Sequence, residues 1–175
     1  TVRAYVLKTG ELRGGKPVIT FQKGEGNALA AAFVANSEML LTVGGNEARL
    51  WNSTTREKIH TYGPHRAVTA VSLSTDGKWA LTGGADGSIK IWDCANGQAV
   101  VRVDKAHKGD LLTSVAFAPG DATKFVTTAA NRDVQLWKWD PAKKTAEAVK
   151  TLEQHKGGLM RSRFSADGKR LVVRM

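Results

Sequence analysis

The residues that could do chemistry in this sequence are four histidines and the hydroxyl and carboxyl groups spaced near them. A hydroxyl, a histidine and a carboxylate can together form a nucleophilic catalytic site. The best-placed set of this kind is Thr82, His65 and Asp86. Such a nucleophile also needs an open substrate position and oxyanion donors, and no motif in the sequence supplies them. We therefore expect no catalytic residues and a protein that is not an enzyme.

Histidines also bind zinc, but the ligands of a zinc site lie close together. The four histidines are His60, His65, His107 and His155. The last three occur once each in similar and well-separated segments, so a metal site is not expected. The glycine-rich segments 42–46 and 82–86 lack the Gly-Lys-Ser/Thr ending of a phosphate loop and are interpreted as turns. No cofactor is expected.

The composition indicates an ordinary folded chain with a basic surface. The 175 residues are 42% hydrophobic and 24% charged, which argues against disorder. The formal net charge of +10 favours acidic partners. No apolar run is long enough for a membrane span, and residues 1–10 lack the apolar region of a secretion signal. We expect a cytoplasmic protein without a membrane partner, while an address removed before Thr1 stays an open alternative.

Internal repeats are the strongest signal in the chain. Four short segments end alike in an aromatic residue, at 2–5, 48–51, 89–92 and 134–137. An Asp-Gly pair at 76–77 precedes the third of these segments and recurs at 167–168. Both pairs stand between apolar residues, which is a hairpin signal because glycine tolerates the positive φ of the turn. The copy with the clearest pattern predicts strands over 68–73, 79–82, 88–92 and 99–103. A repeat of four strands with a tryptophan closing the third is typical of a β-propeller.

At this point the sequence resembles the WD-repeat (WD40) β-propeller family. The pattern runs from His65 through Gly83-Gly84-Ala85-Asp86-Gly87 to Trp92-Asp93. The resemblance implies an all-β fold of four-stranded antiparallel blades, about four to a chain, with residues 1–175 as one propeller segment. Complete blades are expected over 27–62, 67–103 and 111–152. A split blade would take its first and second strands from 159–175 and its third and fourth from 1–21.

The resemblance also implies a hydrogen-bonded network inside each blade. In one copy it consists of His65, Thr82, Asp86 and Trp92, with the Asp86 carboxylate accepting a hydrogen bond from the imidazole. In the next copy the matching residues are His107, Thr127, Asn131 and Trp137, where asparagine replaces the usual aspartate. A buried polar network of this kind must be satisfied throughout. The first complete blade lacks an obvious histidine, and there Asn46 could stand in for the aspartate.

The expected function is a scaffold for protein–protein interaction that docks an acidic partner on the narrow face of the propeller. Each recognisable histidine is followed by a basic residue. The resemblance implies that these loops rim the narrow face around the central channel, where a discontinuous basic ring is then expected. Its possible partner-binding residues are Arg66, Lys108, Leu111 and Lys156. Two alternatives stay open: an electrostatic nucleic-acid-binding module, and a regulatory or sensing part of a larger enzyme.

Three ways of closing the ring are open. The chain could close on itself as four blades, two copies could pair into eight, or the other blades could belong to another propeller half or a longer parent chain. The strand residues are mostly small, which suits the thin gaps between blades in a wide ring. For this reason we favour an eight-bladed assembly over four blades. An open arc is not expected, because it would leave apolar faces and unpaired strand edges in water.

Overall fold

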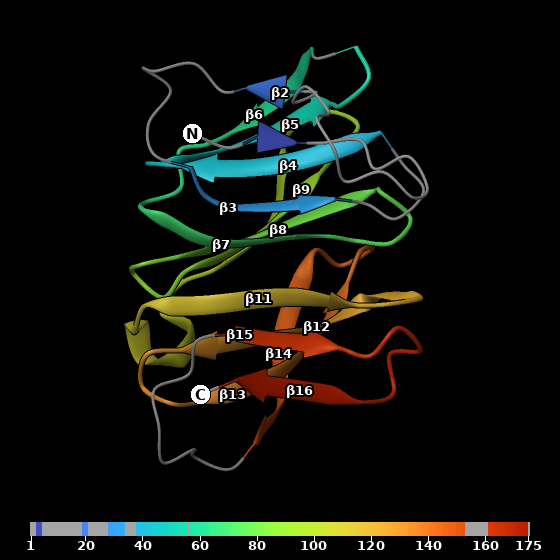
Figure 1. Ribbon diagram of the computed structural model, residues 1–175. Coiled ribbons are helices and arrows are strands. Elements are labelled where there is room, and N and C mark those ends of the chain that lie inside the picture. Colours follow the sequence, from blue (N-terminus) through green and yellow to red (C-terminus); the bar gives the residue numbers. More distant parts are fainter. Residues whose placement is uncertain are drawn as a thin grey trace.

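The computed structural model describes residues 3–4, 19–20, 28–33, 38–55, 57–152 and 161–174. Within these ranges the chain forms sixteen strands and one short 3₁₀ helix. The strands form three four-stranded and two two-stranded antiparallel sheets, which lie one after another in a row (Figure 1). This confirms the expected all-β architecture of four-stranded blades.

Each of the three complete blades is built from consecutive strands. The first contains β3 (Ala28–Phe33), β4 (Met39–Gly44), β5 (Glu47–Asn52) and β6 (Lys58–Tyr62). The second contains β7 (Val68–Leu73), β8 (Trp79–Gly84), β9 (Ile89–Asp93) and β10 (Ala99–Val103). The third contains β11 (Leu112–Ala118), β12 (Asp121–Ala129), β13 (Val134–Asp140) and β14 (Thr145–Leu152). The helix η1 (Ala106–Gly109) connects the second blade to the third.

Strands form where apolar and polar residues alternate in the sequence, and the chain turns at Asp-Gly pairs. The predicted strands of the second blade agree with β7 to β10 within two residues at each end. At the β8–β9 turn, Gly87 has a φ of +73°, and a Cβ there would stand 2.6 Å from the backbone of Gly109. This position therefore needs glycine both for its backbone conformation and for the close approach of η1.

The core lies between blades rather than within one sheet. Leu81 and Ile91 of the second blade are fully buried in one cluster with Leu112 and Phe125 of the third. A second cluster joins the first and second blades. Gly83 permits a close approach, because a Cβ there would meet Leu112 and Val115 side-chain carbons at 2.9 Å. Adjacent complete blades thus cover each other's facing apolar surfaces, as in other repeat architectures.

Two further sheets have two strands each, and they contain the segments that the repeats assign to a split blade. One contains β1 (Arg3–Ala4) and β2 (Ile19–Thr20), and the other contains β15 (Arg161–Phe164) and β16 (Leu171–Arg174). They lie at opposite ends of the row (Figure 1). The propeller is therefore not closed in this structure, and the closure of the ring stays a prediction.

Candidate interaction surfaces

A buried chain of hydrogen bonds ties the second blade together. The indole N–H of Trp92 donates to Thr82 Oγ1 over 2.8 Å, and Thr82 Oγ1 lies 2.7 Å from Nδ1 of His65. On the other side of the ring, His65 Nε2 lies 2.7 Å from Ser88 Oγ, and that hydroxyl donates to Asp86 Oδ1 over 2.5 Å. The network runs from the tryptophan to the carboxylate without a gap.

Only one arrangement of protons satisfies every member of this network. Because the Ser88 hydroxyl donates to the carboxylate of Asp86, it accepts from Nε2–H of His65. Nδ1 of the neutral ring then accepts from the hydroxyl of Thr82, which itself accepts from Trp92. Burial, reinforced by the charge of Lys90, lowers the pKa of His65 to about 4, so the ring is neutral at pH 7.

The structure corrects the expected contact between Asp86 and His65. Ser88 stands between the two side chains, and the Asp86 residue is exposed while Ser88 is buried. The backbone N–H of Ser88 also donates to Asp86 Oδ1. Sequence reasoning missed Ser88, although an aspartate in a turn commonly accepts the N–H of the residue two positions on, which brings that residue beside the carboxylate.

The third blade repeats the network in part. Nε2 of His107 lies 2.6 Å from Thr127 Oγ1, which accepts the indole N–H of Trp137 over 2.8 Å. Asn131 donates to the backbone carbonyl of His107 and to the carboxylate of Asp133, not to the ring. Nδ1 of His107 is buried without a hydrogen-bond partner among the described residues. Burial also lowers the pKa of His107 to about 4.

In the described residues of the first blade, the tryptophan–threonine hydrogen bond is the part of the network that is present. The indole N–H of Trp51 donates to Thr42 Oγ1 over 2.9 Å. Asn46, which could have replaced the aspartate, instead accepts the N–H of Ala67 on its side chain and the N–H of His65 on its carbonyl. It therefore joins the first blade to the second.

Replacing Asp86 with alanine should lower the free energy of unfolding by about 1–2 kcal/mol, because it leaves the buried Ser88 hydroxyl without its acceptor. Asp86→Asn is the matched control, since it keeps an acceptor oxygen and should lose less. Urea denaturation of both variants provides the measurement. A loss below about 0.5 kcal/mol in Asp86→Ala would show that the carboxylate does not anchor the network.

The structure describes three of the four residues of the predicted partner-binding surface. Arg66 and Lys108 are exposed in the loops that precede β7 and β11, and Leu111 is 40% exposed beside them. The loop that precedes β11 also exposes two carboxylates, Asp104 and Asp110, and Asp86 is exposed in the β8–β9 turn. Lys156, the fourth residue of the predicted surface, lies outside the described residues. This surface is therefore of mixed charge.

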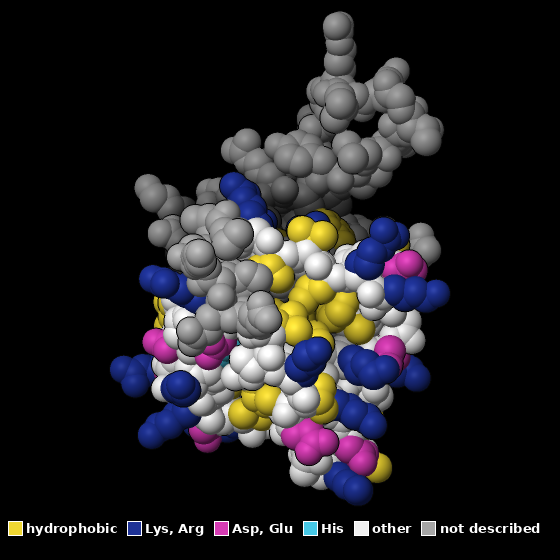
Figure 2. Space-filling model, turned by 90° about the horizontal axis from the view of Figure 1, so that it is seen from below, with side chains coloured by type: hydrophobic (Ala, Val, Ile, Leu, Met, Phe, Trp, Pro, Cys, Tyr) yellow, Lys and Arg dark blue, Asp and Glu magenta, His cyan; other side chains and the backbone are white. Residues whose placement is uncertain are grey.

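A second surface lies at the end of the row that carries β16. Between the third blade and the β15–β16 sheet is a groove of about 510 Å³. Seen from this end, hydrophobic side chains gather near the middle of the face, with lysines and arginines around them (Figure 2). Among the groove residues, Leu136, Leu152, Phe164 and Leu171 form an apolar cluster that is only partly buried. Val149, which also lines the groove, is 55% exposed.

The described part of the chain contains neither a membrane-spanning helix nor a metal-binding cluster. None of its helices has the length and apolar character needed to span a bilayer. Its histidines, cysteine and carboxylates form no cluster of three or more that could bind a metal ion. The single cysteine, Cys94, is buried, and burial raises the pKa of its thiol to about 11.

Comparison with known proteins agrees with this architecture. The family model for the WD domain, G-beta repeat, matches residues 56–93. The methylosome protein WDR77 of Xenopus laevis is 28% identical over 65% of this chain and 35% of its own length. Among solved structures, a chain of the mitotic checkpoint complex superimposes with a TM-score of 0.77 at 22% identity, covering 90% of this chain and 49% of that one. The Cps50 (Swd1) β-propeller domain of Myceliophthora thermophila gives 0.75 at 16% identity, covering 89% and 51%.

The chain thus spans about a third of that relative's length and about half of each solved structure. Repeat spacing, blade topology, the Trp–Thr–His hydrogen bonds and the matched WD domain all agree. The chain is thus similar to WD40-repeat proteins: it contains one matched WD domain, G-beta repeat, over residues 56–93, and its strands form blades of the β-propeller fold.

Proposed function

We propose that this protein is a non-catalytic scaffold for protein–protein interaction. The observation that carries the proposal is the groove between the third blade and the β15–β16 sheet. Exposed apolar surface of this kind marks a place where another protein surface packs. Two similar proteins are named for assemblies, the methylosome and the mitotic checkpoint complex.

The occupant of the groove that we propose is the β1–β2 sheet of a second copy. In the complete blades the second strand pairs with a third, as β12 pairs with β13. Among the described strands, β16 pairs with β15 alone and its other edge is open. The sequence repeats place β1 in the position of a third strand, so β1–β2 supplies the missing pair of strands.

Two copies that exchange these strands would form a closed ring of eight blades with two-fold symmetry, the commonest symmetry of assemblies. Each copy would cover the apolar groove of the other and pair its open strand edge. The mass of the chain in solution tests this pairing, because the pairing doubles it.

A second proposed role is the docking of an acidic protein segment. The net charge of +10 and the exposed side chains of Arg66 and Lys108 support it. Charge complementarity of this kind steers association and is weakened by salt. A nucleic acid is the competing ligand, and its binding would show a steep salt dependence.

Changing Arg66 and Lys108 together to glutamate should weaken binding of a labelled glutamate-rich peptide at least about fivefold, because the change reverses two charges at the docking surface. Lys144→Glu with Lys150→Glu is the matched control, because both lysines are exposed near the β13–β14 turn and along β14. Fluorescence anisotropy at fixed ionic strength measures the affinity. Equal weakening in both double variants would show that binding depends on the overall charge of the protein and not on Arg66 and Lys108.

A further inference from the structure

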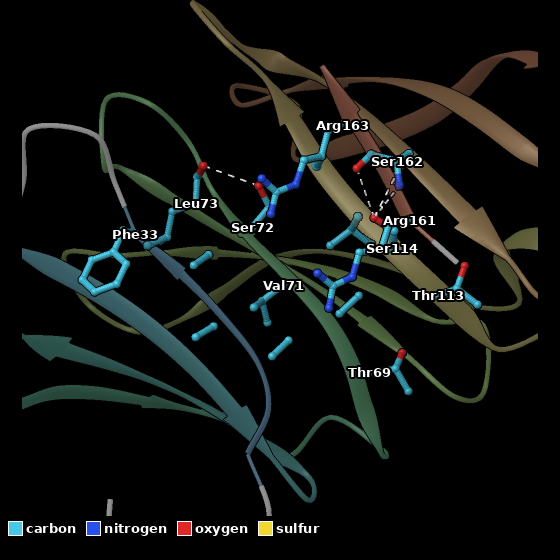
Figure 3. Close-up of a pocket in the computed structure, with 16 residues that line it drawn as sticks. Phe33, Thr69, Val71, Ser72, Leu73, Thr113, Ser114, Arg161, Ser162 and Arg163 are labelled. Carbon is cyan, nitrogen blue, oxygen red and sulfur yellow. Dashed lines mark hydrogen bonds between the residues drawn. The ribbon is translucent and has the colours of Figure 1, made fainter. Parts of the chain in front are cut away.

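The innermost strands of the blades line a second cavity. We call this lining the channel wall. The cavity has a volume of about 500 Å³, and the four strands that line it are β3, β7, β11 and β15 (Figure 3). Its polar groups are hydroxyls and two guanidinium groups. The hydroxyls belong to Thr69, Ser72, Thr113, Ser114 and Ser162. None of the described residues that line this wall carries a carboxylate.

The two positive charges of the wall come from Arg161 and Arg163. They alternate with the buried Ser162 along β15, so they lie on one face of that strand. Figure 3 shows both side chains extending from β15 across the cavity toward β7. Both residues are exposed, and neither forms an ion pair with a carboxylate of the described residues. Two unpaired cations therefore face the same space.

The hydroxyl groups of the wall are already used in part to satisfy the edges of the inner strands. Thr69 Oγ1 of β7 donates to the carbonyl of Leu112 over 2.5 Å. Ser72 Oγ accepts the N–H of Phe117 over 3.1 Å. Ser114 Oγ accepts the N–H of Ser162 over 3.2 Å. A ligand at this wall would therefore be held by side chains rather than by adding a strand to these edges.

We propose that the channel wall binds an extended acidic peptide segment with carboxylates at alternate positions. Side chains on one face of an extended chain repeat every two residues, about 6.6 Å apart, which is also the Cα repeat of Arg161 and Arg163 along β15. Each guanidinium can then hold one carboxylate with a charge-assisted hydrogen bond. At the end of β3, the ring of Phe33 is 57% exposed and offers an apolar contact to a neighbouring peptide residue.

An acidic peptide fits this wall better than a nucleic acid. Single strands are usually held by a row of aromatic side chains on which successive bases stack. Among the residues that line the wall, Phe33 is the one aromatic side chain. The inference rests on the proposed docking of an acidic partner and deepens it, since it names the segment that is bound and adds the channel wall to the loops of Arg66 and Lys108 as a surface that binds it.

The test uses the full chain and a fluorescein-labelled peptide of alternating glutamate and serine. Fluorescence anisotropy should show binding to the wild type that Arg161→Gln with Arg163→Gln weakens at least about tenfold, because two charge-assisted contacts are lost. The matched control, Lys144→Gln with Lys150→Gln, removes the same charge from the outer side of the third blade and should bind as the wild type does. A peptide with glutamine in place of glutamate should not bind. Thermal melting should be alike in both double variants, since all four side chains are exposed.

Each result separates this inference from the proposed docking role. If Arg161→Gln with Arg163→Gln binds as the wild type does while Arg66→Glu with Lys108→Glu does not, the channel wall is overturned and the docking role stands. If neither pair affects binding, or the wild type fails to bind the peptide, both are overturned. If the wall variant instead loses binding of an oligothymidine that the wild type prefers to the peptide, the ligand is a nucleic acid and the inference is wrong.

Discussion

Lowering the pH from 7 to 5 should reduce the free energy of unfolding by roughly 4 kcal/mol, with about 2 kcal/mol from each of two histidines. Burial holds the pKa of His65 and of His107 at about 4, against 6.5 for an exposed histidine. Between these two values the unfolded chain binds protons that the folded chain excludes. Stability therefore rises with pH across this window, is fully present above pH 6.5 and is lost as the pH falls toward 4.

Urea denaturation at half-unit steps of pH measures this slope. His65→Gln and His107→Gln should each remove about half of it, because glutamine can donate and accept but does not titrate. Both variants are expected to be less stable than the wild type at pH 7, so the comparison is between slopes rather than between absolute values. A wild-type stability that is flat from pH 7 to pH 5 would contradict the buried, neutral histidines.

Much of the blade architecture follows from the sequence because its signals are local. Hairpin glycines and alternating apolar residues fix each strand within a short window, and the closing tryptophan marks the third strand. The hydrogen bonds from Trp92 to Thr82 and from Trp137 to Thr127 also follow, since the two residues stand ten apart in both repeats. The bond from Trp51 to Thr42 was not predicted, because that spacing is one residue shorter.

The details of the networks do not follow, because they depend on side-chain depth and on loop conformation. Asp86 is exposed, so Ser88 carries the hydrogen bond inward to His65. In the third blade, His107 lies in η1 with a φ of 51°, and it presents Nε2 rather than Nδ1 to Thr127. No repeat spacing predicts which ring nitrogen a left-handed turn brings to the hydroxyl.

The channel wall could not be predicted from the sequence either. The alternation of Arg161 and Arg163 is visible in it, but one face of any strand can point to a neighbouring blade, to solvent or to the axis. Packing of β15 beside β11 decides that these side chains reach across the cavity. The sequence directed attention instead to the loops that carry Arg66 and Lys108, where exposed carboxylates offset the positive charge.

Replacing Leu171 with aspartate should separate the paired chains into single ones. Leu171 lies in the apolar groove that the β1–β2 sheet of a second copy would cover, and a charge there would be buried without a partner on pairing. Ala142→Asp is the matched control, because Ala142 is exposed in the turn between β13 and β14. It adds the same charge away from the groove and should leave the pair intact. Circular dichroism should confirm that both variants keep their strands.

The mass of the wild-type chain in solution tests the proposed pairing most directly. Light scattering over a range of concentrations should give twice the chain mass of 18.8 kDa, and Leu171→Asp should give a single chain mass. Because both copies are positively charged, added salt should strengthen the pair by screening their repulsion. A soluble wild-type chain that stays at one chain mass at every concentration and salt level would contradict the account.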